Sequence, residues 1–221
     1  MKIEVVVESM PRCGTHYLIR NLMQIFNLGY CTIYEATKRE GQIKEKWNGF
    51  TVTYDAGATW YIADGGKNVD KAKEHYVCKT HFMNPIFGNE EFKKIYLWGN
   101  PLDFVYLTSR LWSDKRGDPN FFLGVGNQAY KMRVEPHLDR LRDWLDRVVE
   151  LPNTIRYEDF LYREALVIRQ LEEIFGVVIP KKKWDAARVI DYRIIYTGWR
   201  DKIDSKIVNH VLEKVGHHVY Y

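Results

Sequence analysis

The N-terminal stretch constrains the fold more than any other segment, because it joins a β-branched run, a glycine turn and a helical pattern. Residues 3–8 (Ile-Glu-Val-Val-Val-Glu) predict a buried first strand. Pro11 and Gly14 indicate that the chain turns directly after it. Apolar residues then recur at helical spacing up to Gly29, which we expect to end the helix: Leu18, Leu22, Ile25 and Phe26.

Further strands and helices alternate along the chain. Short apolar runs predict strands at residues 76–78, 94–98 and 154–157. Helical spacing predicts helices that end near Trp112, Val149, Gly176 and Gly216, the last one starting after Asp204 or Ser205. Residues 33–75 show no clear pattern, and residues 117–128 predict a loop. The alternation predicts an α/β fold with a central parallel sheet flanked by helices, in a single domain over residues 1–221.

Charge and cysteine content exclude few classes of protein. The formal net charge is +4, but Lys and Arg are interleaved with Asp and Glu, so we expect no nucleic-acid partner. The three cysteines form no Cys-x-x-Cys pair, which predicts reduced thiols and a cytoplasmic protein. Met1 leads directly into a strand pattern, and no apolar stretch approaches membrane-spanning length, so we expect no signal peptide and no stable membrane insertion.

The turn after the first strand has the composition of a phosphate site. Residues 11–16 read Pro-Arg-Cys-Gly-Thr-His, which places a cation, a glycine and a hydroxyl at a helix N-terminus. The Walker A pattern G-x-x-x-x-G-K-[ST] is absent. An ordinary strand-to-helix turn remains the alternative at this point.

Four segments, in this order, resemble motifs of the sulfotransferase family. Residues 11–17 are similar to P-[KR]-S-G-T-T-W, with Cys13, His16 and Tyr17 replacing Ser, Thr and Trp. Residues 79–81 match K-T-H, residues 156–160 match R-Y-E-D-[LF], and residues 198–200 are similar to G-D-W-[KR] without the Asp. The resemblance implies a P-loop NTPase-like three-layer fold and sulfuryl transfer from 3′-phosphoadenosine 5′-phosphosulfate (PAPS), with 3′-phosphoadenosine 5′-phosphate (PAP) as product.

The resemblance also implies roles for individual residues. His81 would be the general base, while Arg12 and Lys79 would act on the leaving phosphate and the sulfuryl oxygens. A core or surface histidine and solvated surface cations remain the plain alternatives. The other residues expected to bind the donor are Cys13, Gly14, Thr15, His16, Tyr17, Ser109, Tyr157, Arg193, Gly198, Trp199 and Arg200. Tyr17 and Tyr157 would contact the adenine, and Cys13 has a second interpretation as a reactive thiol at a helix N-terminus.

The segment for the donor's 3′-phosphate departs from the family pattern R-N-P-x-D followed by a serine. Asn100, Pro101 and Asp103 fit, but Gly99 replaces the Arg and Leu107 the Ser. Ser109 lies about 200° further round the helix, so it would need a shifted register to replace the serine. Arg193 aligns with the first Arg of the family's R-K-G, but Ile194 and Ile195 follow it. We expect nearby residues such as Arg193, Arg200, Ser109 or Arg110 to replace the lost contacts.

Two rival functions stay open: a small-molecule kinase with a degenerate P-loop, and a catalytically silent nucleotide-binding relative. The kinase would need Mg²⁺, and no clear acidic ligand for it follows the third strand. We expect no metal, because His217 and His218 lack the partners and spacing of a zinc site. The acceptor would be a small molecule or saccharide with a hydroxyl, and the sequence leaves its identity and the oligomeric state open.

Overall fold

The structure, a computed structural model, describes residues 2–35, 43–47, 50–54, 60–63, 74–82, 92–113, 120–187 and 200–219. Six strands form its main sheet in the order β5-β2-β6-β1-β7-β8. They are β1 (Lys2–Ser9), β2 (Gly29–Glu35), β5 (Trp60–Ala63), β6 (His75–His81), β7 (Lys93–Trp98) and β8 (Thr154–Arg156). The pairs β2–β6, β6–β1, β1–β7 and β7–β8 are parallel, and β5 runs antiparallel to β2 at the edge. A separate antiparallel hairpin joins β3 (Ile43–Trp47) to β4 (Phe50–Tyr54).

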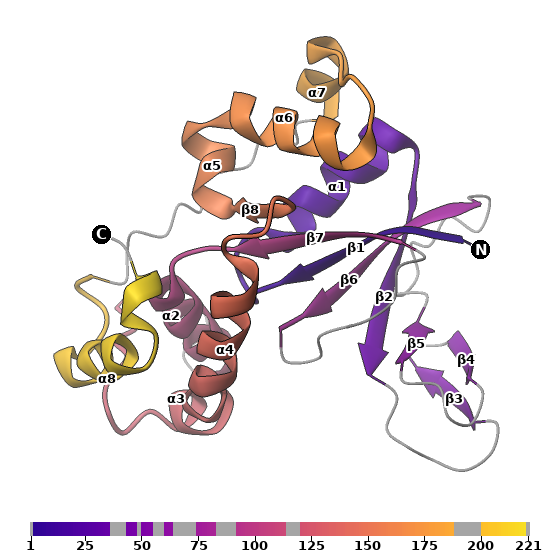
Figure 1. Cartoon of the computed structure of the whole chain (residues 1–221). Coiled ribbons are helices and arrows are strands. Elements are labelled where there is room, and N and C mark those ends of the chain that lie inside the picture. The colour runs from indigo at the N-terminus through magenta and orange to yellow at the C-terminus, as the bar shows by residue number, and fades with distance from the viewer. Residues whose placement is uncertain are drawn as a thin grey trace.

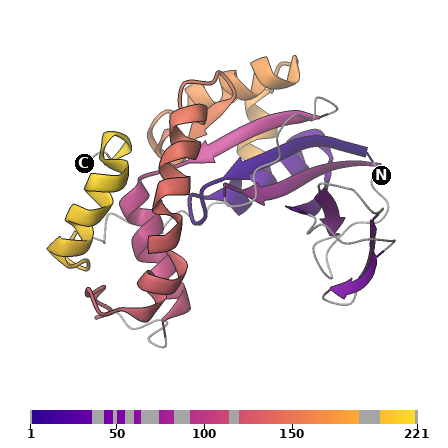
Figure 2. The ribbon, with the colours of Figure 1, turned by 60° about the horizontal axis from the view of Figure 1, so that its bottom comes forward.

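Helices cover both faces of the main sheet (Figure 1). One layer holds α1 (Thr15–Phe26), α5 (Tyr157–Tyr162), α6 (Glu164–Phe175) and α7 (Lys181–Ala187). The other holds α2 (Pro101–Trp112), α3 (Gln128–Arg133), α4 (Leu138–Val148) and α8 (Ser205–Val215), with the 3₁₀ turns η1 (Glu135–His137) and η2 (Gly216–His218). In Figure 2, α8 runs beside α4. This arrangement confirms the predicted three-layer α/β fold.

The core lies where the apolar faces of these layers meet. Val5 and Val7 of β1 are fully buried, as the β-branched run predicts. Leu18 and Leu22 of α1 are buried on one side of the sheet, and Trp144 of α4 on the other. The same core also contains Ile95, Leu97, Phe104, Leu141, Leu145, Val167, Leu171, Val211 and Val215. The sheet is therefore buried on both faces, so its parallel strands need no polar face.

Most boundaries follow the sequence patterns, with two differences. Gly29, expected as a helix stop, is the first residue of β2, because Asn27 already ends α1 in the left-handed conformation. Tyr157 is the first residue of α5 rather than the end of a strand. Asp204 caps α8 by accepting from the Lys206 backbone N–H, as one of the two expected starts requires. The sequence analysis assigned none of β2 to β5, α3, α5 or α7.

The cysteines differ from the expectation of three reduced thiols. Cys78 in β6 is disulfide-bonded, and in the parallel register Cys31 of β2 lies opposite it. Cys13 is free and buried. The expectation is therefore wrong for Cys78, and the thiol argument for a cytoplasmic protein falls with it. Among the described residues, no helix has the length and apolar character needed to cross a membrane.

Candidate functional site

The carboxyl ends of β1 and β6 bring together two segments that the sequence analysis singled out. Ser9, the last residue of β1, pairs in register with His81, the last residue of β6. The turn that leads from β1 into α1 therefore lies beside Lys79 and His81, at the edge where open parallel sheets bind ligands. The tertiary fold thus joins the two motifs in one site.

The turn itself is strained and ends at an uncapped helix. Arg12 has φ 68° and Gly14 has φ 79°, and a non-glycine residue such as Arg12 rarely adopts a positive φ. No side chain caps α1, and its first turn contains no acidic residue. Backbone N–H groups and the helix dipole therefore present partial positive charge at this point, which favours an anion.

Basic side chains surround the same helix end. The Lys79 ammonium donates to His16 Nε2 over 3.3 Å. Burial lowers the pKa of His16 most, and together with the nearby cations Lys79, Arg20 and Arg12, in that order, it brings the pKa to about 4. Burial, followed by Arg12, also lowers the pKa of Lys79. The cations act on one another, and a bound anion would relieve their repulsion.

His81 is held in one orientation by β1. Its Nδ1 lies 3.0 Å from Ser9 Oγ and 3.2 Å from the Ser9 carbonyl oxygen. Ser9 Oγ–H donates to the Thr80 carbonyl oxygen over 3.3 Å and accepts from the Thr15 hydroxyl over 2.8 Å. Because the Ser9 carbonyl oxygen can only accept, Nδ1 carries the ring proton and donates toward Ser9. His81 Nε2 is then the ring nitrogen that carries the lone pair of the neutral imidazole.

The charges around His81 keep it neutral. Burial, followed by the Lys79 charge, lowers its pKa to about 4, although the hydrogen bond to the Ser9 backbone partly opposes both. His16 and Arg12 add smaller effects in the same direction as Lys79. At neutral pH the imidazole is therefore unprotonated and able to accept a proton.

Gly14 is fixed by packing as well as by its backbone conformation. A Cβ at this position would lie 2.3 Å from Cε2 and 2.4 Å from Cδ2 of Tyr157. The Tyr157 ring thus lies directly over Gly14, in the turn where the sequence predicts an anion site. Any side chain at position 14 would meet this ring before it met a ligand.

A cleft opens beside the turn and encloses about 280 Å³ of space, including its open mouth. It carries two carboxylates, Asp103 and Glu158, close to Arg12. Burial and, second, the Glu158 charge raise the pKa of Asp103 to about 7, although Arg200 opposes the rise. The cleft is lined by Met10, Arg12, Cys13, Gly99, Asn100, Asp103, Leu107, Tyr157 and Glu158. Gly99, which lines the cleft beside Asn100, adds no charge to offset these carboxylates.

Several predicted residues have other surroundings than expected. The buried Cys13 thiol donates to the carbonyl oxygens of Met10 at 2.7 Å and Leu97 at 3.2 Å, and burial raises its pKa. A reactive thiol is therefore wrong for Cys13. Thr15 turns to Ser9 and supports His81 instead of facing a sulfate. The Tyr17 ring packs edge-on against Phe160, with ring centroids 5.3 Å apart.

The residues expected to bind the 3′-phosphate differ in where the structure places them. Ser109 is fully buried in α2, outside the cleft lining, which argues against it as a phosphate ligand. Arg200 is exposed and lies close enough to Asp103 to shift its pKa. Arg193, Gly198 and Trp199 lie outside the described residues.

Sequence reasoning missed Ser9 and the role of Glu158. Ser9 had a detectable signal, since it is the last residue of a strand whose carboxyl end must border the site. Glu158 stood within a recognised motif, but only the fold places its carboxylate beside Asp103 in the cleft.

Comparison with known proteins gives little beyond the geometry. No protein-family model matches the chain, and no curated protein matches it. Among solved structures, the crystal structure of mouse sulfotransferase SULT7A1 complexed with PAP matches with a TM-score of 0.45 and 15% sequence identity. That alignment covers 85% of this chain, which spans 62% of the length of the mouse protein.

Proposed function

We propose that the chain is a sulfotransferase that moves a sulfuryl group from PAPS to the hydroxyl of a small molecule or saccharide. One observation carries the proposal: a neutral histidine with a fixed tautomer lies within a cluster of cations at an uncapped helix N-terminus. The histidine is His81, and the surrounding cations are Arg12 and Lys79. The motif resemblance supplies the choice of a sulfuryl group over other anionic groups.

The reaction assigns a step to each of these groups. His81 Nε2 takes the proton of the acceptor hydroxyl as its oxygen attacks the sulfur atom. The bond between the sulfur and the bridging oxygen of the 5′-phosphate breaks, and the bond electrons leave with PAP. Arg12 and Lys79 stabilise the charge that develops on the leaving phosphate, and Lys79, with its lowered pKa, can also supply a proton to it.

The low pKa of His81 fits this scheme only when the donor is bound. A base with a pKa of about 4 accepts protons weakly at neutral pH. The cations that lower this pKa are those a bound phosphosulfate would neutralise, so donor binding should raise it toward the operating pH. The site would then acquire its base strength with the donor in place.

The 3′-phosphate of the donor is the point at which this chain departs most from its family. Asp103 and Glu158 oppose a second dianion in the cleft, and Arg200 is the described cation that acts on Asp103. We expect Arg200, together with Arg193, to hold this phosphate.

Calorimetric titration with PAP, AMP and ADP tests the donor assignment. PAP should bind at least tenfold tighter than AMP, and Arg193→Ala and Arg200→Ala should each remove much of the difference. Arg142→Ala is the matched control, because Arg142 pairs with Asp143 on the surface of α4. Equal affinity of the wild-type protein for PAP and AMP would falsify a donor with a 3′-phosphate.

The acidic pair also gives the kinase alternative one observation in its favour. Carboxylates beside a phosphate-binding turn are the usual ligands of Mg²⁺. A transfer assay with radiolabelled PAPS and with ATP, run over a panel of hydroxyl acceptors with and without EDTA, separates the two functions. Transfer from PAPS that EDTA leaves unchanged supports the sulfotransferase, and ATP-dependent transfer that EDTA abolishes supports the kinase.

A further inference from the structure

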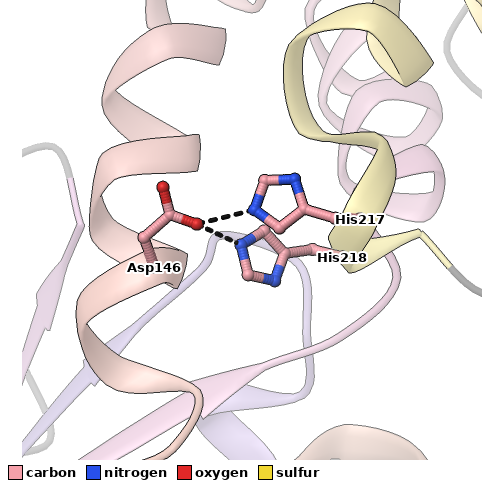
Figure 3. A group of neighbouring side chains, drawn as sticks. All are labelled: Asp146, His217 and His218. Carbon is pink, nitrogen blue, oxygen red and sulfur yellow. Dashed lines mark hydrogen bonds and ion pairs between the residues drawn. The ribbon is translucent and has the colours of Figure 1, made fainter.

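Two histidines and a carboxylate converge at the C-terminal end of the described chain, away from the residues of the cleft. His217 and His218 of η2 direct their Nε2 atoms at the same oxygen of Asp146 in α4, as Figure 3 shows. The distances to Asp146 Oδ1 are 2.6 Å for His217 and 2.8 Å for His218. The three side chains offer ligand atoms that all lie within 4.8 Å of one another.

The spacing is close to that of a bound metal ion. Zinc binds histidine nitrogen at about 2.0–2.1 Å and carboxylate oxygen at about 2.0–2.2 Å, so ligand atoms in a tetrahedral site lie roughly 3.3 Å apart. The two present hydrogen bonds would have to lengthen by less than about 1 Å to admit the ion. To bind the ion, each neutral ring offers the Nε2 lone pair and carries its single proton on Nδ1, so that proton moves from Nε2 to Nδ1 by exchange with solvent as the ion takes its place beside Asp146.

We propose that Asp146, His217 and His218 bind a divalent transition-metal ion of the zinc class at a site separate from the transfer site. Two imidazole nitrogens with one carboxylate suit Zn²⁺ and Co²⁺, whereas Mg²⁺ prefers oxygen ligands alone. The side chains of His217 and Asp146 are 57% and 46% exposed, so the fourth coordination position faces solvent.

The fold holds the ligands in place before any ion arrives. His218 is buried to 9% exposure and packs edge-on against Trp98 of β7, with ring centroids 6.3 Å apart. On the same pair of helices, Lys214 of α8 donates to Asp139 of α4 over 2.9 Å. This second link between α8 and α4 limits how far the histidines can move from Asp146. A metal ion there would link η2, the turn after α8, to α4, which precedes β8 and the cleft residues Tyr157 and Glu158.

This inference departs from the expectation that His217 and His218 lack metal partners. Two adjacent histidines rarely share a ligand in regular structure, because neighbouring side chains of a helix or strand point apart. The 3₁₀ turn brings both rings together, with centroids 3.9 Å apart, and α4 supplies the third ligand. Neither feature could be seen in the spacing of the sequence.

The competing explanation is a plain pair of hydrogen bonds that fastens α8 to α4. Glutamine separates the two explanations, because its amide N–H can still donate to Asp146 but its nitrogen does not bind metal. The chain also offers a matched control in His75, whose Nδ1 lies 2.5 Å from Glu4 Oε1 in an exposed pair with one histidine.

The test is titration of untagged full-length protein with Zn²⁺ by calorimetry and with Co²⁺ by visible absorption. We expect one equivalent to bind, tetrahedral Co²⁺ bands to appear, and Mg²⁺ to give no signal. His217→Gln, His218→Gln and Asp146→Asn should each weaken Zn²⁺ binding at least tenfold. His75→Gln should leave the Zn²⁺ affinity within twofold of wild type.

Each outcome decides the proposal. Absence of binding at millimolar Zn²⁺ overturns it, as does equal Zn²⁺ affinity in wild type and both glutamine variants. Because His217 is exposed, His217→Gln should fold, and its far-UV circular dichroism and melting temperature without metal check this. PAP titration of the same variant distinguishes the metal proposal from the proposed function. We expect unchanged PAP affinity whether or not Zn²⁺ binds.

Discussion

Two pairs of histidines show opposite electrostatic surroundings in one fold. Burial, together with Lys79 and Arg12, lowers the pKa values of both His16 and His81, and Arg20 also lowers that of His16. His217 and His218 instead share the carboxylate of Asp146. The first pair lies at the carboxyl ends of the parallel strands, and the second joins a C-terminal turn to α4.

The difference indicates which ligand each pair can take. A histidine surrounded by cations is held neutral and leaves positive charge for an anion to neutralise. A histidine pair facing a carboxylate offers neutral nitrogen and anionic oxygen to a cation. In our two proposals, the same residue type therefore serves an anion at the carboxyl ends of the strands and a metal ion between α4 and the turn after α8.

His81→Ala should have the largest effect, because it removes the proposed base. We expect transfer to fall by roughly 10²–10⁴-fold with PAP affinity nearly unchanged. Turnover with PAPS and calorimetry with PAP measure the two quantities, and His217→Ala serves as the control from the second pair. Near wild-type turnover in His81→Ala would show that the base is another group.

Replacement of Arg12 tests whether its side chain, held in the strained turn, binds the anion. Arg12→Gly keeps the positive φ at little cost but removes the charge, so PAP affinity should fall roughly ten- to a hundredfold. The melting temperature of Arg12→Gly should equal or exceed that of wild type, because glycine relieves the backbone strain. Arg12→Ala should lose the same affinity without this gain. An Arg12→Gly variant that unfolds more easily but binds PAP normally contradicts the assignment.

Gly14→Ala measures how tightly the turn around the first pair is built. The left-handed conformation costs alanine about 1–2 kcal/mol, and the added Cβ meets the Tyr157 ring. Chemical denaturation should therefore show a loss larger than the backbone cost alone. In a double-mutant cycle with Tyr157→Ala, the two losses should be less than additive. Strict additivity would mean that the ring moves aside freely.

The smallest expected effect is on the pH dependence of folding stability, which should come from the first pair. His16 and His81 have pKa values lowered from 6.5 to about 4, so the unfolded chain binds more protons between these values. Stability should fall as the pH drops from about 6.5 toward 4, and His81→Gln should reduce the fall.

Proton linkage gives the matching measurement for the ligand. An anion that neutralises the cations raises both pKa values, so PAP binding near pH 5 should take up protons. Calorimetry in two buffers of different ionisation heat measures the uptake. Zero uptake at pH 5 contradicts contact between the bound anion and the first pair.

The sequence by itself determined the layered α/β fold and singled out the two motifs that meet at the carboxyl ends of β1 and β6. The apolar runs near residues 5, 77, 96 and 155 predict buried parallel strands, because such strands are covered on both faces. The helix stop at Gly176 and the start of α8 at Asp204 also follow from local chemistry. These features depend on neighbours in the chain, which is why the pattern reveals them.

The tertiary structure alone decided the features that join distant segments. Ser9 sets the tautomer of His81 because β1 and β6 end side by side, and Tyr157 covers Gly14 because β8 delivers α5 to the turn. Asp146 reaches His217 and His218 from 71 and 72 residues away. Periodicity reports only which face of its own element a residue occupies, so contacts between elements emerge when the layers pack.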